Sequence, residues 1–120
     1  MKQYTITKFK DWQSVPVINI DTPYGDKPED IFAYGQVAYT DQAILVHLRA
    51  VEKNIRSEEN DVLGMPCRDS CLEFFFCPNS EELRYFNIEF NPVGCMFLGF
   101  GSSPKNLTRL VIDPKELFDL

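Results

Sequence analysis

Two segments in the second half of the chain alternate polar and apolar residues, which is the pattern of a strand with one buried face. In both segments the even positions are apolar, and the odd positions include carboxylates, amides and a phenol. The polar odd-position residues are Glu73, Tyr85, Asn87, Glu89 and Asn91. Planar carboxylates and amides can read hydroxyl groups with two hydrogen bonds, and an aromatic ring can stack on the C–H face of a sugar. A face of this kind could therefore bind a polyhydroxylated ligand such as a sugar.

A third alternating segment, Ala43–Val51, places His47 and Arg49 on one face and only apolar residues on the other. If the three segments are neighbours in one sheet, His47 and Arg49 join the polar residues above on a single outer face. The alternative is an ordinary solvated face, on which Arg49 and Glu73 are merely paired across strands. Trp12, close to the amino terminus, either supplies a ring to the ligand or covers an edge of the core.

Catalysis by the same carboxylates is a second hypothesis. Glycoside hydrolysis uses two carboxylates, and Glu73, Glu89 and the nearby Asp69 could supply them. Acidic pairs on strands are usually structural, however, so we expect a protein without enzymatic activity. A serine or cysteine nucleophile would need His47, the only histidine, as its base, and the chain has no G-x-S-x-G motif.

The cysteines and acidic residues predict neither a metal site nor a cofactor. The four cysteines, with three, five and seventeen residues between them, match no zinc pattern, and we expect them to be free thiols. Oxygen ligands for a structural calcium ion could come from loop acids, which are Asp21, Asp26 and Asp30.

Length and charge exclude several classes of protein. A chain of 120 residues is long enough for one domain, which we expect to span residues 1–120. Its composition, with 44% hydrophobic and 25% charged residues, is typical of a globular protein. The net charge of −6, without a lysine or arginine cluster, argues against nucleic acid and anionic membranes as partners. Since no apolar run approaches the ~20 residues of a membrane helix and the amino terminus has no apolar signal core, we expect a cytoplasmic protein.

Period-two alternation and turn residues predict strands over most of the chain. The expected strands are Tyr4–Phe9, Gln36–Tyr39, Ala43–Val51, Cys71–Cys77, Arg84–Asn91, Gly94–Phe100 and Thr108–Ile112. Such spacing predicts an all-β fold, an antiparallel β-sandwich. Thr22–Asp30 and Glu52–Arg68 are irregular, and the second is long enough to be a functional loop. Asp113 is a predicted helix N-cap, with Pro114 at the first helical position. Three of the last four residues are apolar and would have to be buried by further chain, so we expect a truncated carboxyl end.

The order of several motifs resembles the carbohydrate-binding modules of family nine, in particular the stand-alone branch of that family. These motifs are VHLRAVE (residues 46–52), RDSCLEFFF (68–76), YFNIEFN (85–91), and Gly94 followed by LGFG (98–101). Asp69-Ser70-Cys71-x-Glu73-Phe-Phe is the most specific of them. Trp12 followed by VPVINI (15–20) also fits the family.

The resemblance implies a jelly-roll-like β-sandwich related to DOMON domains, and this chain covers the amino-terminal part of the family domain. A haem site of the DOMON type would need an axial pair, for which His47 with Met65 or Met96 is a faint candidate. Family members hold a sugar between aromatic rings, read its hydroxyls with polar side chains and bind calcium structurally. Glu73 matches a sugar-contacting glutamate, and Asn87 and Arg49 lie on flanking strands. Cys67 stands where many members have a tryptophan, so one ring of the clamp is expected to be absent. Uncovered strand edges predict a homodimer or strand exchange, and the alternative function is a structural or oligomerisation module that uses its sheet face or edge.

Overall fold

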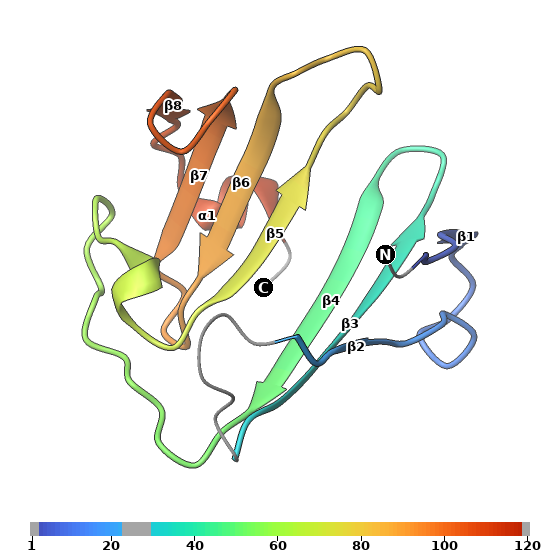
Figure 1. The fold of residues 1–120 in the computed structure, drawn as a ribbon, viewed down its shortest axis with the longest axis horizontal. Helices are drawn as coiled ribbons and strands as arrows, with labels where there is room; N and C mark the ends of the chain where they lie inside the picture. The colour runs from blue at the N-terminus through green and yellow to red at the C-terminus, as the bar shows by residue number, and fades with distance from the viewer. Residues whose placement is uncertain (1–2, 23–29, 119–120) are drawn as a thin grey trace. The chain divides into compact units, whose positions relative to one another are not determined.

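The computed structural model of the 120-residue chain describes residues 3–22 and 30–118, and nearly all of their regular structure is strand (Figure 1). In chain order the elements are β1 (Thr7–Lys8), β2 (Ile18–Ile20), β3 (Phe32–Tyr39), β4 (Ile44–Val51), the 3₁₀ helix η1 (Pro66–Arg68), β5 (Leu72–Phe76), β6 (Tyr85–Phe90), β7 (Met96–Gly101), β8 (Leu107–Arg109) and α1 (Pro114–Leu117). No helix in the described part of the chain is long and apolar enough to cross a membrane.

The chain divides into two compact units, residues 1–53 and 54–120, and each unit contains one four-stranded sheet. Every strand pair is antiparallel except β1 with β3, which is parallel. Two four-stranded sheets, antiparallel in all pairs but one, confirm the predicted all-β fold class.

In the first unit, β3 is the strand with which the other three pair. β4 pairs with it along its whole length, from Phe32 opposite Val51 to Tyr39 opposite Ile44. β2 and β1 pair with different halves of β3, near its beginning and its end. The sequence missed β2 and the first half of β3, because alanine and glycine in Phe32–Gly35 interrupt the alternation of large and polar residues.

In the second unit the strands follow one another in the order β5-β6-β7-β8 (Figure 1). The even positions of β5 and β6 share an apolar face, as the alternation predicts, and aromatic rings fill much of it. Phe86 and Phe100, for example, lie on adjacent strands with ring centroids 4.6 Å apart. β8 begins at Leu107 and ends at Arg109, so it is shorter than the expected strand Thr108–Ile112.

Local turn chemistry explains how the strands of the second unit end. In the turn between β6 and β7 the amide N–H of Gly94 donates to the carbonyl of Asn91 at 3.1 Å, and Gly94 has a φ of +80°, a conformation that favours glycine. At α1 the carboxylate of Asp113 accepts the N–H of Lys115 at 3.0 Å, which confirms the predicted N-cap. Of the apolar residues after α1, Phe118 packs edge-on against Phe90 with centroids 5.3 Å apart, and Leu120 lies outside the described residues.

Gly101→Ala is expected to displace β8 from β7. A Cβ atom at Gly101 would lie 1.8 Å from the carbonyl oxygen of Asn106, a backbone atom that cannot move without breaking the pairing of the two strands. We expect a loss of about 2 kcal/mol in the free energy of unfolding, measured by urea denaturation. Gly94→Ala is the control, because a Cβ there meets nothing and only the positive φ costs about 1 kcal/mol. An equal loss in the two variants would contradict the steric argument.

Candidate functional site

The polar residues of β5 and β6 do share one face of their sheet. Glu73 lies directly opposite Glu89, and Phe75 lies opposite Asn87. Residues opposite each other in an antiparallel pair point to the same side. The face so formed carries Glu73, Phe75, Tyr85, Asn87 and Glu89. On the neighbouring strand β7, glycines lie opposite Tyr85 and Asn87, so these two side chains have no side chain directly beside them there.

Asn87 and Glu89 form a buried pair at the centre of this face. Each is only 7% exposed, and Nδ2 of Asn87 donates to Oε1 of Glu89 at 2.9 Å. The other acceptors of the pair, Oδ1 of Asn87 and Oε2 of Glu89, have no hydrogen-bond partner among the described residues. A buried acceptor without a partner costs about 1–3 kcal/mol. The pair therefore favours a ligand that brings donors or positive charge.

The pKa values of the titratable groups near this face also favour a ligand that brings donors or positive charge. Burial, followed by the charge of Glu89, raises the pKa of Glu73. Burial and then the charges of Glu73 and Glu89 raise the pKa of the Cys71 thiol to about 12, and the same causes raise the pKa of Cys67. Negative charge is thus disfavoured at Glu73, Cys71 and Cys67. A hydroxyl donor or a cation at this place would relieve the strain between them.

Two aromatic rings border the polar face. The rings of Phe75 and Tyr85 lie 5.8 Å apart with a tilt of 49°, and Phe75 is 55% exposed. Tyr85 is among the predicted site residues, whereas Phe75 is not. The register of β5 against β6 is what brings the two rings together, and that register follows from the pairing of Phe75 with Asn87.

The structure contradicts the assumption that Ala43–Val51 is a neighbour of the other two polar strands in one sheet. β4 pairs with β3 in the first unit, so His47 lies opposite Gln36 and Arg49 opposite Tyr34. The suggested pairing of Arg49 with Glu73 across adjacent strands is wrong for the same reason. β3 and β4 are joined by a tight turn, and such a hairpin pairs its own two strands before any other.

In the first unit a buried glutamine, which sequence analysis missed, organises the surroundings of His47 and Trp12. Nε2 of Gln36 donates to the carbonyls of Trp12 and Val15 at 2.8 and 2.9 Å. Oε1 of Gln36 therefore faces Nδ1 of His47 at 3.2 Å, and because an amide oxygen only accepts, Nδ1 is the donor. The ring of Trp12 lies against that of His47, with centroids 5.3 Å apart, and is 37% exposed.

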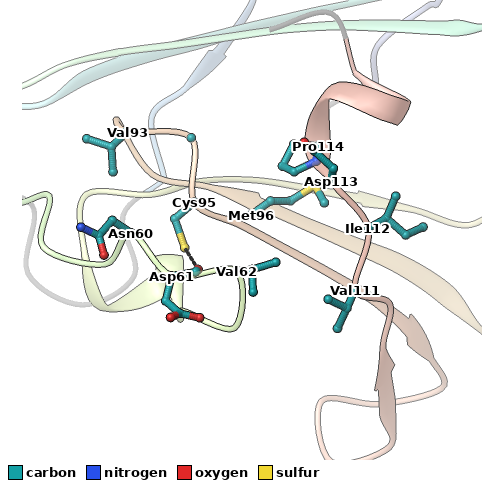
Figure 2. A pocket seen from close by; sticks show the side chains of 11 residues that line it. Asn60, Asp61, Val62, Val93, Cys95, Met96, Val111, Ile112, Asp113 and Pro114 are labelled. Atoms are coloured by element: carbon teal, nitrogen blue, oxygen red, sulfur yellow. Dashed lines mark hydrogen bonds between the residues drawn. The ribbon is translucent and has the colours of Figure 1, made fainter.

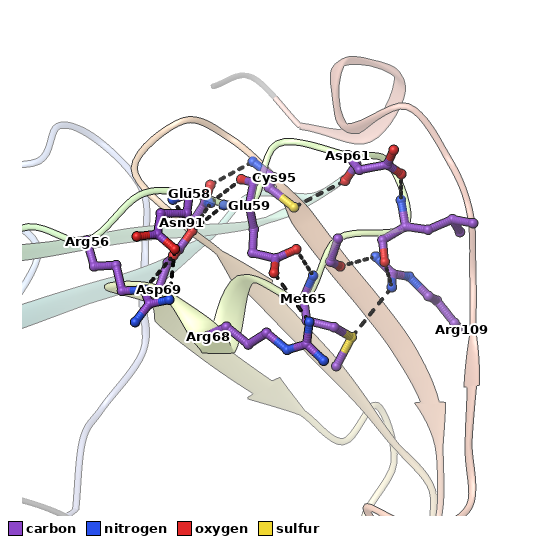
Figure 3. A network of polar contacts seen from close by, with 12 residues as sticks. Arg56, Glu58, Glu59, Asp61, Met65, Arg68, Asp69, Asn91, Cys95 and Arg109 are labelled. Atoms are coloured by element: carbon purple, nitrogen blue, oxygen red, sulfur yellow. Dashed lines mark hydrogen bonds and ion pairs between the residues drawn. The ribbon is translucent and has the colours of Figure 1, made fainter.

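The loop before β5 is held in place by Asp69, as Figure 3 shows. Its side chain is fully buried, and Oδ2 accepts the N–H groups of Glu58 and Glu59 at 2.9 and 2.8 Å. Burial alone would raise the pKa of Asp69, but these hydrogen bonds, together with one from Asn91 and the charge of Arg56, lower it. Asp69 is thus a structural anchor, and the hypothesis of an acid or base at this position has no support in its surroundings.

Asn91 belongs to the same network, and its amide is fully engaged. Nδ2 donates to the carbonyl of Glu59 at 2.6 Å and to Oδ2 of Asp69 at 2.9 Å, while Oδ1 accepts the N–H groups of Val93 and Cys95. No donor or acceptor of this side chain is left for a ligand. We therefore assign Asn91 to the loop and not to the site.

A pocket of about 370 Å³ in the second unit lies apart from these residues (Figure 2). Its wall is mostly aliphatic and includes no aromatic ring. The lining residues are Asn60, Asp61, Val62, Val93, Gly94, Cys95, Met96, Val111, Ile112, Asp113 and Pro114. Because Asp113 caps α1 and Asp61 Oδ1 accepts the N–H of Leu63, its acidic side chains already have partners. None of the predicted site residues lines this pocket.

The structural calcium ion stays a prediction, because Asp26, one of the three loop acids that could bind it, lies outside the described residues. The group of described side chains that could hold a metal ion is Cys71, Glu73 and Glu89, whose thiol does not suit the all-oxygen shell of calcium. Sδ of Met65, a candidate haem ligand, is contacted by Nη1 of Arg109 at 3.7 Å.

Comparison with known proteins agrees with the resemblance that the motifs indicate. The family model described as carbohydrate-binding family 9 matches residues 4–118, nearly the whole chain. No curated protein and no solved structure gave a match. The family consists of non-catalytic modules that bind carbohydrate. Because the match covers far more than half of the sequence, the chain belongs to carbohydrate-binding family 9.

Proposed function

We propose that this chain is a non-catalytic module that binds a mono- or oligosaccharide through the polar face of β5 and β6. The observation that carries the proposal is the buried Asn87–Glu89 pair, whose two free acceptors lie on the same face as Glu73. Sugar hydroxyls are the donors that such acceptors require. The rings of Phe75 and Tyr85 at the border of this face supply an apolar surface for the C–H groups of the sugar.

Each residue then has a distinct role. Glu73 is exposed and accepts hydrogen bonds from the sugar hydroxyls directly. Asn87 and Glu89 lie deeper, where the hydrogen bond between them fixes their orientation before the ligand arrives. A preorganised pair loses little conformational entropy on binding, which favours affinity. Phe75, more than half exposed, is the ring that a sugar can reach most easily.

Binding fits the geometry better than glycoside hydrolysis. A hydrolase needs two carboxylates that flank the scissile bond. Glu73 and Glu89 lie side by side on one face of the sheet, and Glu89 is only 7% exposed. A glycosidic bond therefore has no access to a position between them, and we expect no turnover of a chromogenic glycoside.

Glu73→Gln is expected to weaken saccharide binding by at least about tenfold. The carboxylate makes charge-assisted hydrogen bonds worth about 1.5–3 kcal/mol, and a loss of 1.4 kcal/mol is one order of magnitude in affinity. Calorimetric titration with a panel of mono- and oligosaccharides measures the effect. The variant should unfold at no lower temperature than the native chain, because it removes the repulsion that raises the pKa of Glu73.

Glu81→Gln is the control, since Glu81 is an exposed glutamate on the turn between β5 and β6. It should leave the affinity unchanged. Equal affinities for the native chain and Glu73→Gln would exclude Glu73 from the site. Absence of heat with every saccharide, together with a molecular mass that grows with protein concentration, would favour the alternative of a structural or oligomerisation module.

A further inference from the structure

We propose that Cys71, Glu73 and Glu89 form a binding site for a zinc ion. One ligand atom from each of these three side chains, a sulfur and two carboxylate oxygens, lies within 4.8 Å of the others. Cys71 directly precedes β5, and Glu73 follows two residues later on the same side of the strand. The pairing of Glu73 with Glu89 across β5 and β6 brings in the third ligand. Two rigid neighbouring strands therefore hold the whole set.

No lysine or arginine of the described residues forms an ion pair with the carboxylates of this cluster. Two carboxylates so close together are stable either with a shared proton or with a bound cation.

An independent observation at the same place indicates a ligand. The side chain of Asn87 is only 7% exposed, and its amide nitrogen donates to Oε1 of Glu89. This contact places the amide beside the cluster, yet Oδ1 of Asn87 and Oε2 of Glu89 have no partner among the described residues. Buried acceptors of this kind almost always have a partner in a folded protein. An ion bound by Glu89 supplies that partner directly, and a water on the ion can donate to Asn87.

The donor set selects zinc among the common cations. A thiolate is a soft ligand that calcium and magnesium do not favour, whereas zinc accepts sulfur and carboxylate oxygen together. Three protein ligands leave the fourth tetrahedral position to water. When the ion binds, a bond forms between zinc and Sγ of Cys71, and the Sγ–H proton passes to the solvent. The exposed Glu73 provides the route of entry from solvent.

Cobalt(II) is the probe for this site, because a thiolate ligand gives it a sulfur-to-metal charge-transfer absorption. The full chain, stripped with a chelator and free of saccharide, should develop this band with saturation at one cobalt per chain, and zinc should abolish it. Cys71→Ser should remove the band and weaken zinc binding by about a hundredfold. Cys77 lies on the turn after β5 and outside the cluster, so Cys77→Ser should change neither the absorption band nor the affinity for zinc.

A chain without the charge-transfer band, or with a band that survives Cys71→Ser, would overturn the proposal. Glu89→Gln is the second variant in case Cys71→Ser does not fold. It keeps the thiol, so weaker cobalt and zinc binding in this variant supports the site, and unchanged binding contradicts it. The proposal does not rest on saccharide binding: Cys71→Ser should retain the heat of a saccharide titration, so the two proposals can fail separately.

Discussion

Asp69→Ala is expected to lower the melting temperature by about 10 °C or more. The buried carboxylate accepts three hydrogen bonds, two from the backbone N–H groups of Glu58 and Glu59 and one from the side chain of Asn91. Alanine removes the acceptor of all three donors, of which the N–H of Glu59 and the amide of Asn91 are partly buried. Each such donor costs about 1–3 kcal/mol, and 1 kcal/mol corresponds to about 4–8 °C in a small domain. Differential scanning calorimetry of the full chain measures the change.

Asp61→Ala is the control for this effect. Asp61 lies in the same loop but is exposed, and its carboxylate accepts only the N–H of Leu63 at 2.8 Å. We expect its melting temperature to stay within a few degrees of the native value. If the two alanine variants melt at the same temperature, the buried network around Asp69 does not stabilise the loop.

Acid should weaken the contribution of Asp69, and the direction follows from its pKa. Hydrogen bonds hold that pKa below the ordinary value of 3.8 in the folded chain. The stabilisation is therefore fully present above the pKa of the unfolded chain and is lost as the pH falls through the lower folded pKa. Asp69→Asn, which has no proton to gain, should be less stable than the native chain at pH 7. The difference should narrow below about pH 4, and a constant difference would contradict the assignment.

The one motif Asp69-Ser70-Cys71-x-Glu73 serves two physical purposes that the sequence alone does not separate. Asp69 and Ser70 hold the preceding loop, because Oγ of Ser70 accepts the N–H of Arg56 at 3.0 Å and its own N–H donates to the carbonyl of Arg56. Cys71 and Glu73 face the candidate site instead. The loop Glu52–Arg68 is thus not a free surface connection, since much of its backbone is bonded to these side chains.

Alternation along the strands predicted which residues of β5 and β6 share a face, since side-chain direction in a strand depends only on parity. It did not predict that this polar face would be the more deeply buried one at Asn87 and Glu89. That burial comes from η1, which packs against β6 and is built from a polar loop without periodicity. Local sequence carries no information on where such a loop returns to the sheet.

Other parts of the site depend on contacts between distant residues. The thiol and carboxylates of Cys71, Glu73 and Glu89 come from two strands, so no spacing along the chain resembles a metal motif, and the sequence predicted none. The pairing of β4 with β3 was missed because the alternation of polar and apolar residues does not show which strands are neighbours in a sheet. Only the register of hydrogen bonds decides which polar faces adjoin, and that register is set by turns and packing.

Arg109→Lys is expected to lower the free energy of unfolding by about 3 kcal/mol, although it conserves the charge. The guanidinium of Arg109 binds the loop before η1 through a fork of donors. Nη1 donates to the carbonyl of Leu63 at 2.8 Å, and Nη2 donates to those of Val62, Gly64 and Met96 at 3.2, 2.7 and 3.1 Å. A lysine ammonium carries its three donors on a single nitrogen, so it cannot reach all the carbonyls that the two guanidinium nitrogens bind.

The loss follows from the carbonyls that remain without a donor, since a hydrogen bond to a charged group contributes about 1.5–3 kcal/mol. Arg109 also lies over the ring of Phe97, 5.1 Å from its centroid, and the compact ammonium would lose that stacking. Urea denaturation measures the total effect. Hydrogen exchange at the amide of Gly64, which donates to the carbonyl of Asp61 at 2.8 Å, should become faster because the loop opens more often.

Arg84→Lys is the matched control for Arg109→Lys. Arg84 also lies over a phenylalanine ring, that of Phe100 at 5.0 Å, and it pairs with Glu82, but it binds no buried carbonyl and both side chains contact water. Exposed ion pairs contribute little, so the stability of this variant should be nearly native. If both arginine variants unfold at the native urea concentration, the fork of Arg109 does not hold the loop. A loss confined to Arg109→Lys would show that four backbone carbonyls around one guanidinium fix the loop from which η1 reaches β6.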